Sequence, residues 1–229
     1  MKKIILSLAL LAGLTTAAQA QTGLKLGLKG GFNMSTFSGA DSKGSEYKAG
    51  FAAGGLLNYG FTDMLSVQGE LLYSQLGASR DGINFTNNGT AYTNGTAKTT
   101  LGYINVPILL KVNTGDEGKG LFFELGPQGS FIINQRSFLE DNGGKQQGSS
   151  VTTTDALNKA VIGYVAGIGY QLTSGLGLGI RYAGDFSQVY KDGGTSTSTT
   201  VGGVTTTVAN PNLHNSVFQF QVHYLFGGK

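Results

Sequence analysis

The stretch that decides the fold is Val217 to Phe226, which reads VFQFQVHYLF. Large apolar residues occupy every second position from Phe218 onward, and the side chains between them include Gln219, Gln221 and His223. Alternation with a period of two indicates a β-strand that has one apolar and one polar face. The pattern fits a soluble sandwich, which buries the apolar face, and equally a membrane barrel, which turns that face to lipid. The rest of the chain has to decide between them.

The N-terminal stretch MKKIILSLALLAGLTTAAQAQ has the three parts of a secretory signal peptide. Two lysines come first, an apolar run from Ile4 to Leu14 follows, and Ala18-Gln19-Ala20 supplies the small-x-small cleavage site. We therefore expect residues 1–20 to be a signal peptide that is cleaved after Ala20, and residues 21–229 to form one exported domain.

The composition excludes several classes of protein. Without Lys2 and Lys3, the 16 basic residues become 14 against 13 acidic ones, so no nucleic-acid-binding surface is expected. The sequence has no cysteine, which excludes disulfides, thiolate metal sites, a cysteine nucleophile and a lipoprotein-type acceptor. Charged residues make up only 13% against a typical figure of about 25%. Beyond the signal, no apolar run approaches the roughly 20 residues of a spanning helix, so a membrane crossing would have to use strands.

Eight segments alternate in the manner of the last one, at about 24–37, 47–60, 65–78, 99–113, 120–134, 160–172, 176–186 and 213–226. Each is long enough for one tilted crossing, which takes roughly 9 to 11 residues. Three connections are short (FTDML, TGDEGKG and TSG), and the four between them are long and polar. Short turns on one rim and long loops on the other are typical of outer-membrane barrels. The sequence predicts an all-β fold: an eight-stranded antiparallel up-and-down transmembrane β-barrel in the cell outer membrane, with both termini periplasmic.

The polar face of these strands carries the charges. If the apolar face of each strand meets lipid, the charges of the wall share the opposite face, as expected where a lipid-facing Lys or Arg costs roughly 2 to 4 kcal/mol. In so narrow a barrel, side chains fill the interior, so we interpret this face as a plug of salt bridges among four basic and three acidic residues and not as an ion pathway. The expected polar network of the lumen comprises Lys25, Lys29, Gln68, Glu70, Lys111, Glu124, Gln128, Arg181, Asp185, Gln219, Gln221 and His223.

Some smaller features complete the pattern. Within the long loop after the fifth segment, TTDALNKA suits one helical turn capped by Thr154 or Asp155. The low-complexity stretch 191–208 suits either disorder or an extension of the last hairpin. Aromatic residues near the strand ends suit the two interfacial girdles of a barrel; they are Tyr47, Tyr59, Phe61, Tyr170, Tyr182, Phe186, Phe218, Tyr224 and Phe226.

Four stretches, LGLKGGFNMS, ELLYSQLG, YINVPILLK and ELGPQGSFII, together resemble the PorT-like outer-membrane β-barrel family of Bacteroidota. The most specific element is the strand motif around Pro107, because proline inside a strand is tolerated only at an edge or a bulge. The chain departs from the family at Asn105, where an acidic residue is more usual. It also ends LFGGK, which leaves Phe226 as the expected signal residue for the barrel-assembly machinery. The resemblance implies location and fold, and one branch of the family resembles a component needed for protein secretion and gliding.

The sequence is compatible with several functions. We favour a non-enzymatic barrel, without catalytic residues, cofactor or metal, whose long loops bind a partner, a surface ligand or lipopolysaccharide among the outer-membrane lipids. An accessory of a secretion or assembly complex is the alternative. A lipid-modifying enzyme or protease would have to use His214 with Asp185 and Ser187 or Ser216, the only candidate Ser-His-Asp set. A diffusion pore is disfavoured by the strand count. His214 and His223 stand nine residues apart and form no metal-ligand cluster.

Overall fold

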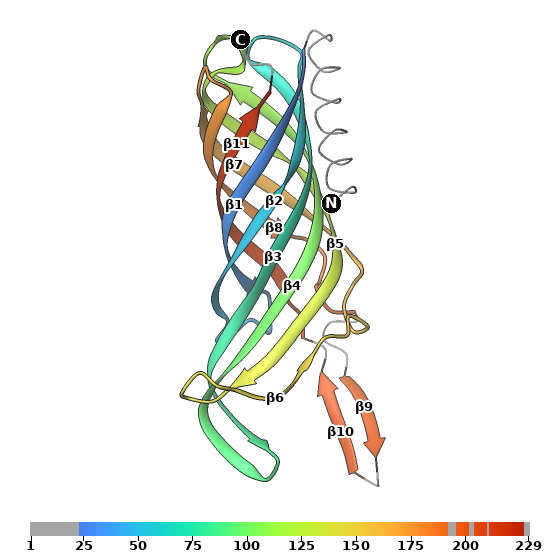
Figure 1. Cartoon of the computed structure of the whole chain (residues 1–229). Helices are drawn as coiled ribbons and strands as arrows, with labels where there is room; N and C mark the ends of the chain where they lie inside the picture. The colour runs from blue at the N-terminus through green and yellow to red at the C-terminus, as the bar shows by residue number, and fades with distance from the viewer. Residues whose placement is uncertain (1–22, 192–195, 202–203, 210, 227–229) are drawn as a thin grey trace, which may run out of the picture.

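The chain forms a closed cylinder of antiparallel strands in a computed structural model that describes residues 23–191, 196–201, 204–209 and 211–226 (Figure 1). The expected signal peptide, residues 1–20, lies outside the described residues. Eight strands build the wall: β1 (Leu24–Ser38), β2 (Glu46–Gly60), β3 (Leu65–Asn87), β4 (Thr90–Asn113), β5 (Gly120–Glu140), β7 (Ala160–Gln171), β8 (Leu176–Asp185) and β11 (His214–Leu225).

Pairing runs around the whole ring. Each wall strand pairs with the next wall strand along the chain, β4 pairs with β5, and β11 returns to pair with β1. Closure leaves no edge in the wall, which removes the unpaired backbone groups that a bilayer would not tolerate. The predicted eight-stranded antiparallel up-and-down barrel is confirmed.

Four described elements lie outside the ring. The short strand β6 (Gln146–Val151) pairs with the far end of β5, and β9 (Ser196–Val201) pairs with β10 (Val204–Ala209) as a separate two-stranded sheet. One 3₁₀ turn, η1 (Asp116–Gly118), lies in the connection between β4 and β5. Among the described residues, no helix is long and apolar enough to span a membrane.

The register of β1 against β11 decides which face of the last strand is inside. Asn33 is opposite Gln219 and Phe32 opposite Phe220, so residues of like polarity meet across the pair. Gln219, Gln221 and His223 are 6%, 3% and 2% exposed, and Phe220 is 48% exposed. The polar face therefore lines the interior and the aromatic face lies on the outer wall, which is the inverse of a soluble sandwich.

Two prolines interrupt the ladder without leaving the wall. Pro107 has no register partner on β3, where pairing stops between Gly69 and Leu72, and Pro127 has none on β4. Each proline still pairs on its other side. Because proline has no N–H to donate, each one interrupts the backbone hydrogen bonds with only one of its two neighbouring strands. The predicted edge or bulge at Pro107 is thus a local gap inside a closed sheet.

One inward glycine marks a close approach of two strands. At Gly126 a Cβ atom would overlap the carbonyl oxygen of Ile108 on β4, beside the ladder gap at Pro127. At the outward Gly69 a Cβ would meet nothing within 4 Å. Glycine is therefore required at position 126 by the approach of the neighbouring backbone, whereas position 69 has open space.

The wall strands end within one residue of the predicted limits at the short-turn end, but three of them run past these limits at the other end, which we call the long-loop end. We expected strands at about 65–78, 99–113 and 120–134, whereas β3, β4 and β5 contain 23, 24 and 21 residues. The expected polar loop between β3 and β4 is a continuous hairpin that turns at Asn88 and Gly89, both with positive φ (49° and 78°). Asn-Gly is the preferred pair for a type I′ turn because both residues tolerate that backbone conformation.

Two further loop expectations can be compared with the structure. The stretch TTDALNKA forms no helix; Leu157 donates its backbone N–H to the Thr154 carbonyl (3.1 Å) in a single turn. Its Leu157 side chain is fully buried, which fixes the segment by packing. Within 191–208, the described part forms the β9–β10 hairpin, which pairs with itself and not with β8 or β11.

The aromatic residues gather in two groups on the outer wall. At the short-turn end, Tyr59 contacts Phe61 and Tyr224 contacts Phe226, with ring centroids 5.1 and 5.3 Å apart. Toward the long-loop end, a continuous row of ring contacts runs through Tyr47, Phe218, Tyr182, Tyr164 and Phe186. Between the groups lies a belt of exposed aliphatic side chains, among them Leu71, Leu125 and Ile108, each at least 57% exposed. The girdle positions proposed from the sequence thus lie on the outside at two levels.

Candidate functional site

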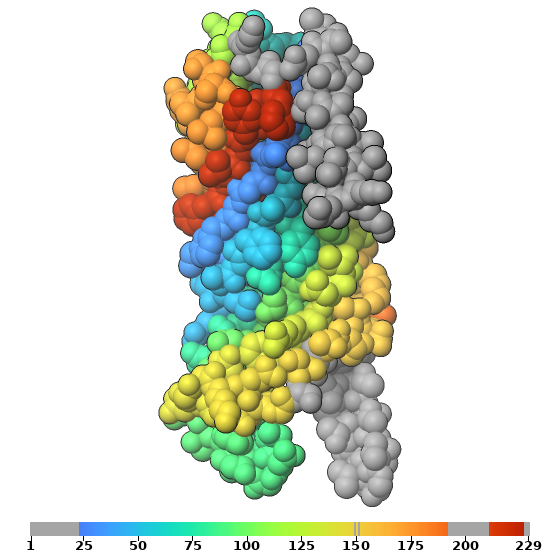
Figure 2. Space-filling view, viewed as in Figure 1, coloured from blue at the N-terminus to red at the C-terminus, as the bar shows by residue number. Residues whose placement is uncertain are grey.

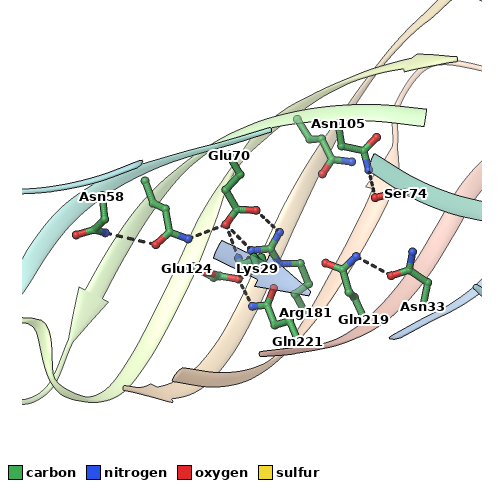
Figure 3. A network of polar contacts seen from close by, with 12 residues as sticks. Lys29, Asn33, Asn58, Glu70, Ser74, Asn105, Glu124, Arg181, Gln219 and Gln221 are labelled. Atoms are coloured by element: carbon green, nitrogen blue, oxygen red, sulfur yellow. Dashed lines mark hydrogen bonds and ion pairs between the residues drawn. The ribbon is translucent and has the colours of Figure 1, made fainter. Parts of the chain in front are cut away.

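The lumen contains an ion-pair network at mid-height, formed by Lys29, Glu70, Glu124 and Arg181 (Figure 3). Arg181 donates to both carboxylate oxygens of Glu70 (2.9 and 3.0 Å) and to Glu124 Oε1 from Nε (2.9 Å). Lys29 pairs with Glu70. All four side chains are at most 2% exposed, so two positive and two negative charges compensate one another away from bulk water.

Amide side chains add hydrogen bonds to the network, although Glu124 Oε2 remains without a described partner. Gln68 Nε2 donates to Glu70 (2.6 Å), and Gln221 Nε2 donates to Glu124 (2.9 Å). One step further along the lumen, Gln219 Nε2 donates to Asn33 Oδ1 (2.6 Å) and Gln128 Nε2 to Ser130 (3.2 Å). The wall strands bring these residues together because each stands at an inward position of the two-residue period.

Three of the seven charges that we expected to pair across the lumen do not. Lys25 is half-buried at the short-turn end and donates only to the Glu117 carbonyl (3.4 Å). Lys111 donates to Gln171 Oε1 (3.3 Å), and Asp185 accepts from Asn215 Nδ2 (2.6 Å). The expectation is wrong for these three. Lys25 and Asp185 stand at other heights, near the start of β1 and at the end of β8. Lys111 is the register partner of Glu124, but the Oε1 atom of Glu124 is engaged by Arg181 and Gln221. His223 contacts Gln171 (2.7 Å), beside Lys111.

Between the network and the long-loop end, the lumen contains a cluster of buried apolar side chains. We call this cluster the apolar cap: Phe37, Leu76, Ala78, Leu101, Tyr103, Ile132, Leu157, Val189, Leu213 and Val217. Leu157, Val189 and Leu213 lie outside the wall strands and are at most 7% exposed. Sequence reasoning missed the cap, although the inward positions Leu76, Leu101 and Tyr103 were already apolar in the pattern.

Loop contacts hold the cap in place. The loops before β7 and after β8 are joined by a bridge between Leu157 and Tyr190, and the Asn158 amide donates to the carbonyls of Gln188 (2.7 Å) and Tyr190 (3.2 Å). Val189 donates its N–H to the Leu213 carbonyl (2.8 Å). Between cap and network remains a void of about 10 Å³, room for one water molecule at most.

Beyond the cap, the extended ends of β3, β4 and β5 together with β6 form a projecting platform, seen in green and yellow at the lower end of Figure 2. A cleft of about 340 Å³ runs between its two hairpins. Its lining combines aromatic rings, amides and hydroxyls; Phe85, Phe138, Asn87, Gln147, Thr99 and Ser137 contribute. Lys98, at the side of the cleft, forms an ion pair with Glu140 (2.7 Å), which compensates its charge.

The β5–β6 turn of the platform is ordered by Asp141. Its carboxylate accepts the backbone N–H groups of Lys145 (2.9 Å) and Gly143 (3.0 Å) and the Gln147 amide (2.8 Å). The hydrogen bond from the Lys145 N–H is the largest of the contributions that lower the pKa of this carboxyl below its ordinary value. The turn therefore keeps its anionic anchor at neutral pH.

The candidate Ser-His-Asp set is not assembled. His214 Nδ1 contacts the backbone carbonyl of Ser187 (3.1 Å), and the Ser187 hydroxyl accepts the Ile162 N–H (3.2 Å). Ser216 contacts the Tyr182 hydroxyl (3.0 Å), and Asp185 accepts from the Asn215 amide, with no hydrogen bond to His214 among the described contacts. A triad needs its base within hydrogen-bond reach of both the nucleophile and the acid. Among the described residues, no group of His, Cys, Asp and Glu could hold a metal ion.

Residues 18–190 match the family model described as the outer membrane protein beta-barrel domain. The chain belongs to this family. It is an outer-membrane β-barrel, and the aliphatic belt between its two aromatic groups is its lipid-facing wall. From Phe218 to Phe226 the wall spans roughly 20 Å along the axis, taking about 3.3 Å per residue and a tilt of about 40°, close to the apolar height of about 25 Å in such barrels.

Solved structures with a similar chain course include Neisserial surface protein A, at 13% identity and a TM-score of 0.49, covering 88% of this barrel and 98% of that chain. The Ail protein of Yersinia pestis is 13% identical with a TM-score of 0.42, over 90% and 100% of the two chains. OprG from Pseudomonas aeruginosa is 12% identical with a TM-score of 0.37, over 91% and 98%. No curated protein sequence matches the chain.

Proposed function

We propose that this protein is a small non-enzymatic outer-membrane barrel with a closed lumen, whose platform binds an envelope component at the cell surface. The long-loop end is the extracellular end in this proposal, and both termini are periplasmic. Short periplasmic turns and longer extracellular loops are the rule in this class of barrel, which supports the orientation.

The platform is the observation that carries the proposal. Ala78 on β3 pairs with Tyr47, which belongs to the aromatic group toward the long-loop end. From there β3 continues to Asn87, roughly 30 Å further at about 3.3 Å per residue. A wall that only had to cross the membrane would end near Ala78. Strand pairing holds the extra length rigid, and a rigid element is a better support for a binding surface than a mobile loop.

The chemistry of the cleft indicates the kind of group that would bind. Phe85 is stacked on Tyr92 with ring centroids 5.1 Å apart, and Phe138 lies under the Arg136 guanidinium at 5.1 Å. Flat apolar rings beside amides and hydroxyls offer both packing and hydrogen bonds, as pockets for polar organic ligands do. Lipopolysaccharide, with its dense sugar hydroxyls, is the envelope component that we propose.

A photo-crosslinking amino acid tests this surface. We expect the probe at Phe138, in the cleft, to give a product that contains lipopolysaccharide in intact cells. The matched control places the probe at Phe61, which is 59% exposed at the short-turn end, where no such product is expected. Electrophoresis with staining for protein and for lipopolysaccharide reads out both sites.

The same experiment separates the alternative, an accessory role of the PorT-like kind in a secretion complex. Crosslinks from Phe61 to the same export proteins in every preparation, without lipopolysaccharide at Phe138, would replace our proposal by that one. If neither the lipopolysaccharide product at Phe138 nor the export-protein crosslinks at Phe61 were found, a binding role would be contradicted for both ends of the barrel.

A further inference from the structure

Lys111 is a buried cation of the lumen that has no ion-pair partner in the network. Lys111 is 1% exposed, and no described carboxylate lies within ion-pairing distance of its ammonium group. Its register partner on β5 is Glu124, whose Oε1 is engaged by Arg181 and Gln221. Lys111 itself has only the amide oxygen of Gln171 at 3.3 Å and the face of Phe122 at 4.0 Å.

Hydrogen bonding fixes how the groups around Lys111 are oriented. An ammonium can only donate, so the Gln171 atom that faces it is the oxygen, and the His223 Nε2 at 2.7 Å from the same oxygen must carry a hydrogen. Three buried polar atoms of the surrounding residues are then left without a protein partner: Gln171 Nε2, His223 Nδ1 and Oε2 of the register partner Glu124. The Gln171 amide is 3% exposed and holds an unused N–H donor beside an uncompensated cation.

A cavity of about 600 Å³ lies at the short-turn end of the barrel, and Lys111 is the residue of this group that lines it. Lys111 lines its inner part and Lys25 its wall, with Asn58, Ser66 and Asn113 as further polar groups. Asp63 and Glu117 also line it, but both are exposed, and Glu117 is paired with Lys119. Water screens those rim carboxylates, whereas the charge of Lys111 acts in a medium of lower polarity.

We propose that the inner end of this cavity binds a small inorganic oxyanion such as phosphate, with the Lys111 ammonium as its main contact. The Lys25 ammonium group lines the same cavity and would add a second positive charge. The anion compensates a charge that is costly to leave unpaired. Because the cavity opens along the barrel axis and not sideways into lipid, its source is the aqueous phase and not a lipid headgroup.

Isothermal titration calorimetry tests the site, with sodium phosphate added to the full mature chain in detergent at low chloride. We expect saturable binding to the wild type and at least tenfold weaker binding to Lys111→Met, because hydrogen bonds to charged groups are among the strongest in proteins. The control, Lys98→Met, removes a charge at the opposite end of the barrel and should leave the affinity unchanged.

A second variant guards against loss of folding. Gln171→Glu places a carboxylate beside Lys111, so the barrel should keep its heat-modifiable electrophoretic mobility and lose phosphate binding by the same factor. No saturable binding to the wild type, equal affinity in Lys111→Met or Gln171→Glu, or an equal loss in Lys98→Met would each overturn the proposal. A second titration of the wild type uses a short-chain phosphatidic acid in place of phosphate. If this lipid bound more tightly than phosphate, the proposal that the anion comes from the aqueous phase would be wrong.

Discussion

Glu70→Gln is expected to lower the free energy of unfolding by about 3 to 5 kcal/mol, the usual cost of leaving a buried charge uncompensated. The Glu70 carboxylate accepts hydrogen bonds from Lys29, from both terminal nitrogens of Arg181 and from the Gln68 amide, and its side chain is fully buried. The neutral amide keeps the shape but leaves two cations to share the single charge of Glu124. Urea unfolding of the barrel in lipid vesicles, followed by tyrosine fluorescence, measures the loss.

The control for this variant is Glu140→Gln. Glu140 pairs with Lys98, whose side chain is 37% exposed on the platform, and exposed pairs contribute about 0 to 1 kcal/mol. Equal losses in the two variants would mean that the lumen pair is hydrated like a surface pair, which contradicts a dry network at mid-height.

Leu101→Ala is expected to cost about 3 to 5 kcal/mol, because it opens a cavity in the apolar cap as well as removing apolar contact. Leu101 is fully buried at an inward position of β4, between the network and the loops that bring in Leu157 and Val189. The rigid wall limits how far the surroundings can collapse into the space. The same unfolding assay measures the change.

The matched variant is Leu71→Ala, at an outward position of β3 that is 60% exposed to lipid. Lipid chains fill the space that the side chain leaves, so only the transfer term remains, about 1 to 2 kcal/mol. If Leu71→Ala were as costly as Leu101→Ala, the cap would not be a packed core.

The membrane-crossing part of the fold was predictable because alternation and turn residues act locally. The predicted starts at residues 24, 65, 120 and 176 coincide with those of β1, β3, β5 and β8. The outer hairpin was missed because both faces of that stretch are polar, so alternation gives no signal there. Its Asn88-Gly89 pair was nevertheless a sufficient indication of a tight hairpin turn.

The candidate site was predictable only as a list of inward residues. Strand phase gives the face on which a side chain lies, and it correctly placed Lys29, Glu70 and Arg181 inside. It does not give height along the axis, which depends on strand stagger, so it could not separate Lys25 and Asp185 from the network. The loop residues Leu157 and Val189 enter the lumen through tertiary packing, which no local pattern encodes.

The central claim, that the ion-pair network and the apolar cap close the lumen, is tested most directly by planar-bilayer recording of the purified mature chain. We predict no stable openings above the bare-lipid baseline, with a porin reconstituted in the same way as the positive control. The void between network and cap has room for one water at most, and the side chains of both layers are buried. Reproducible, long-lived openings from the monomeric barrel would contradict the account.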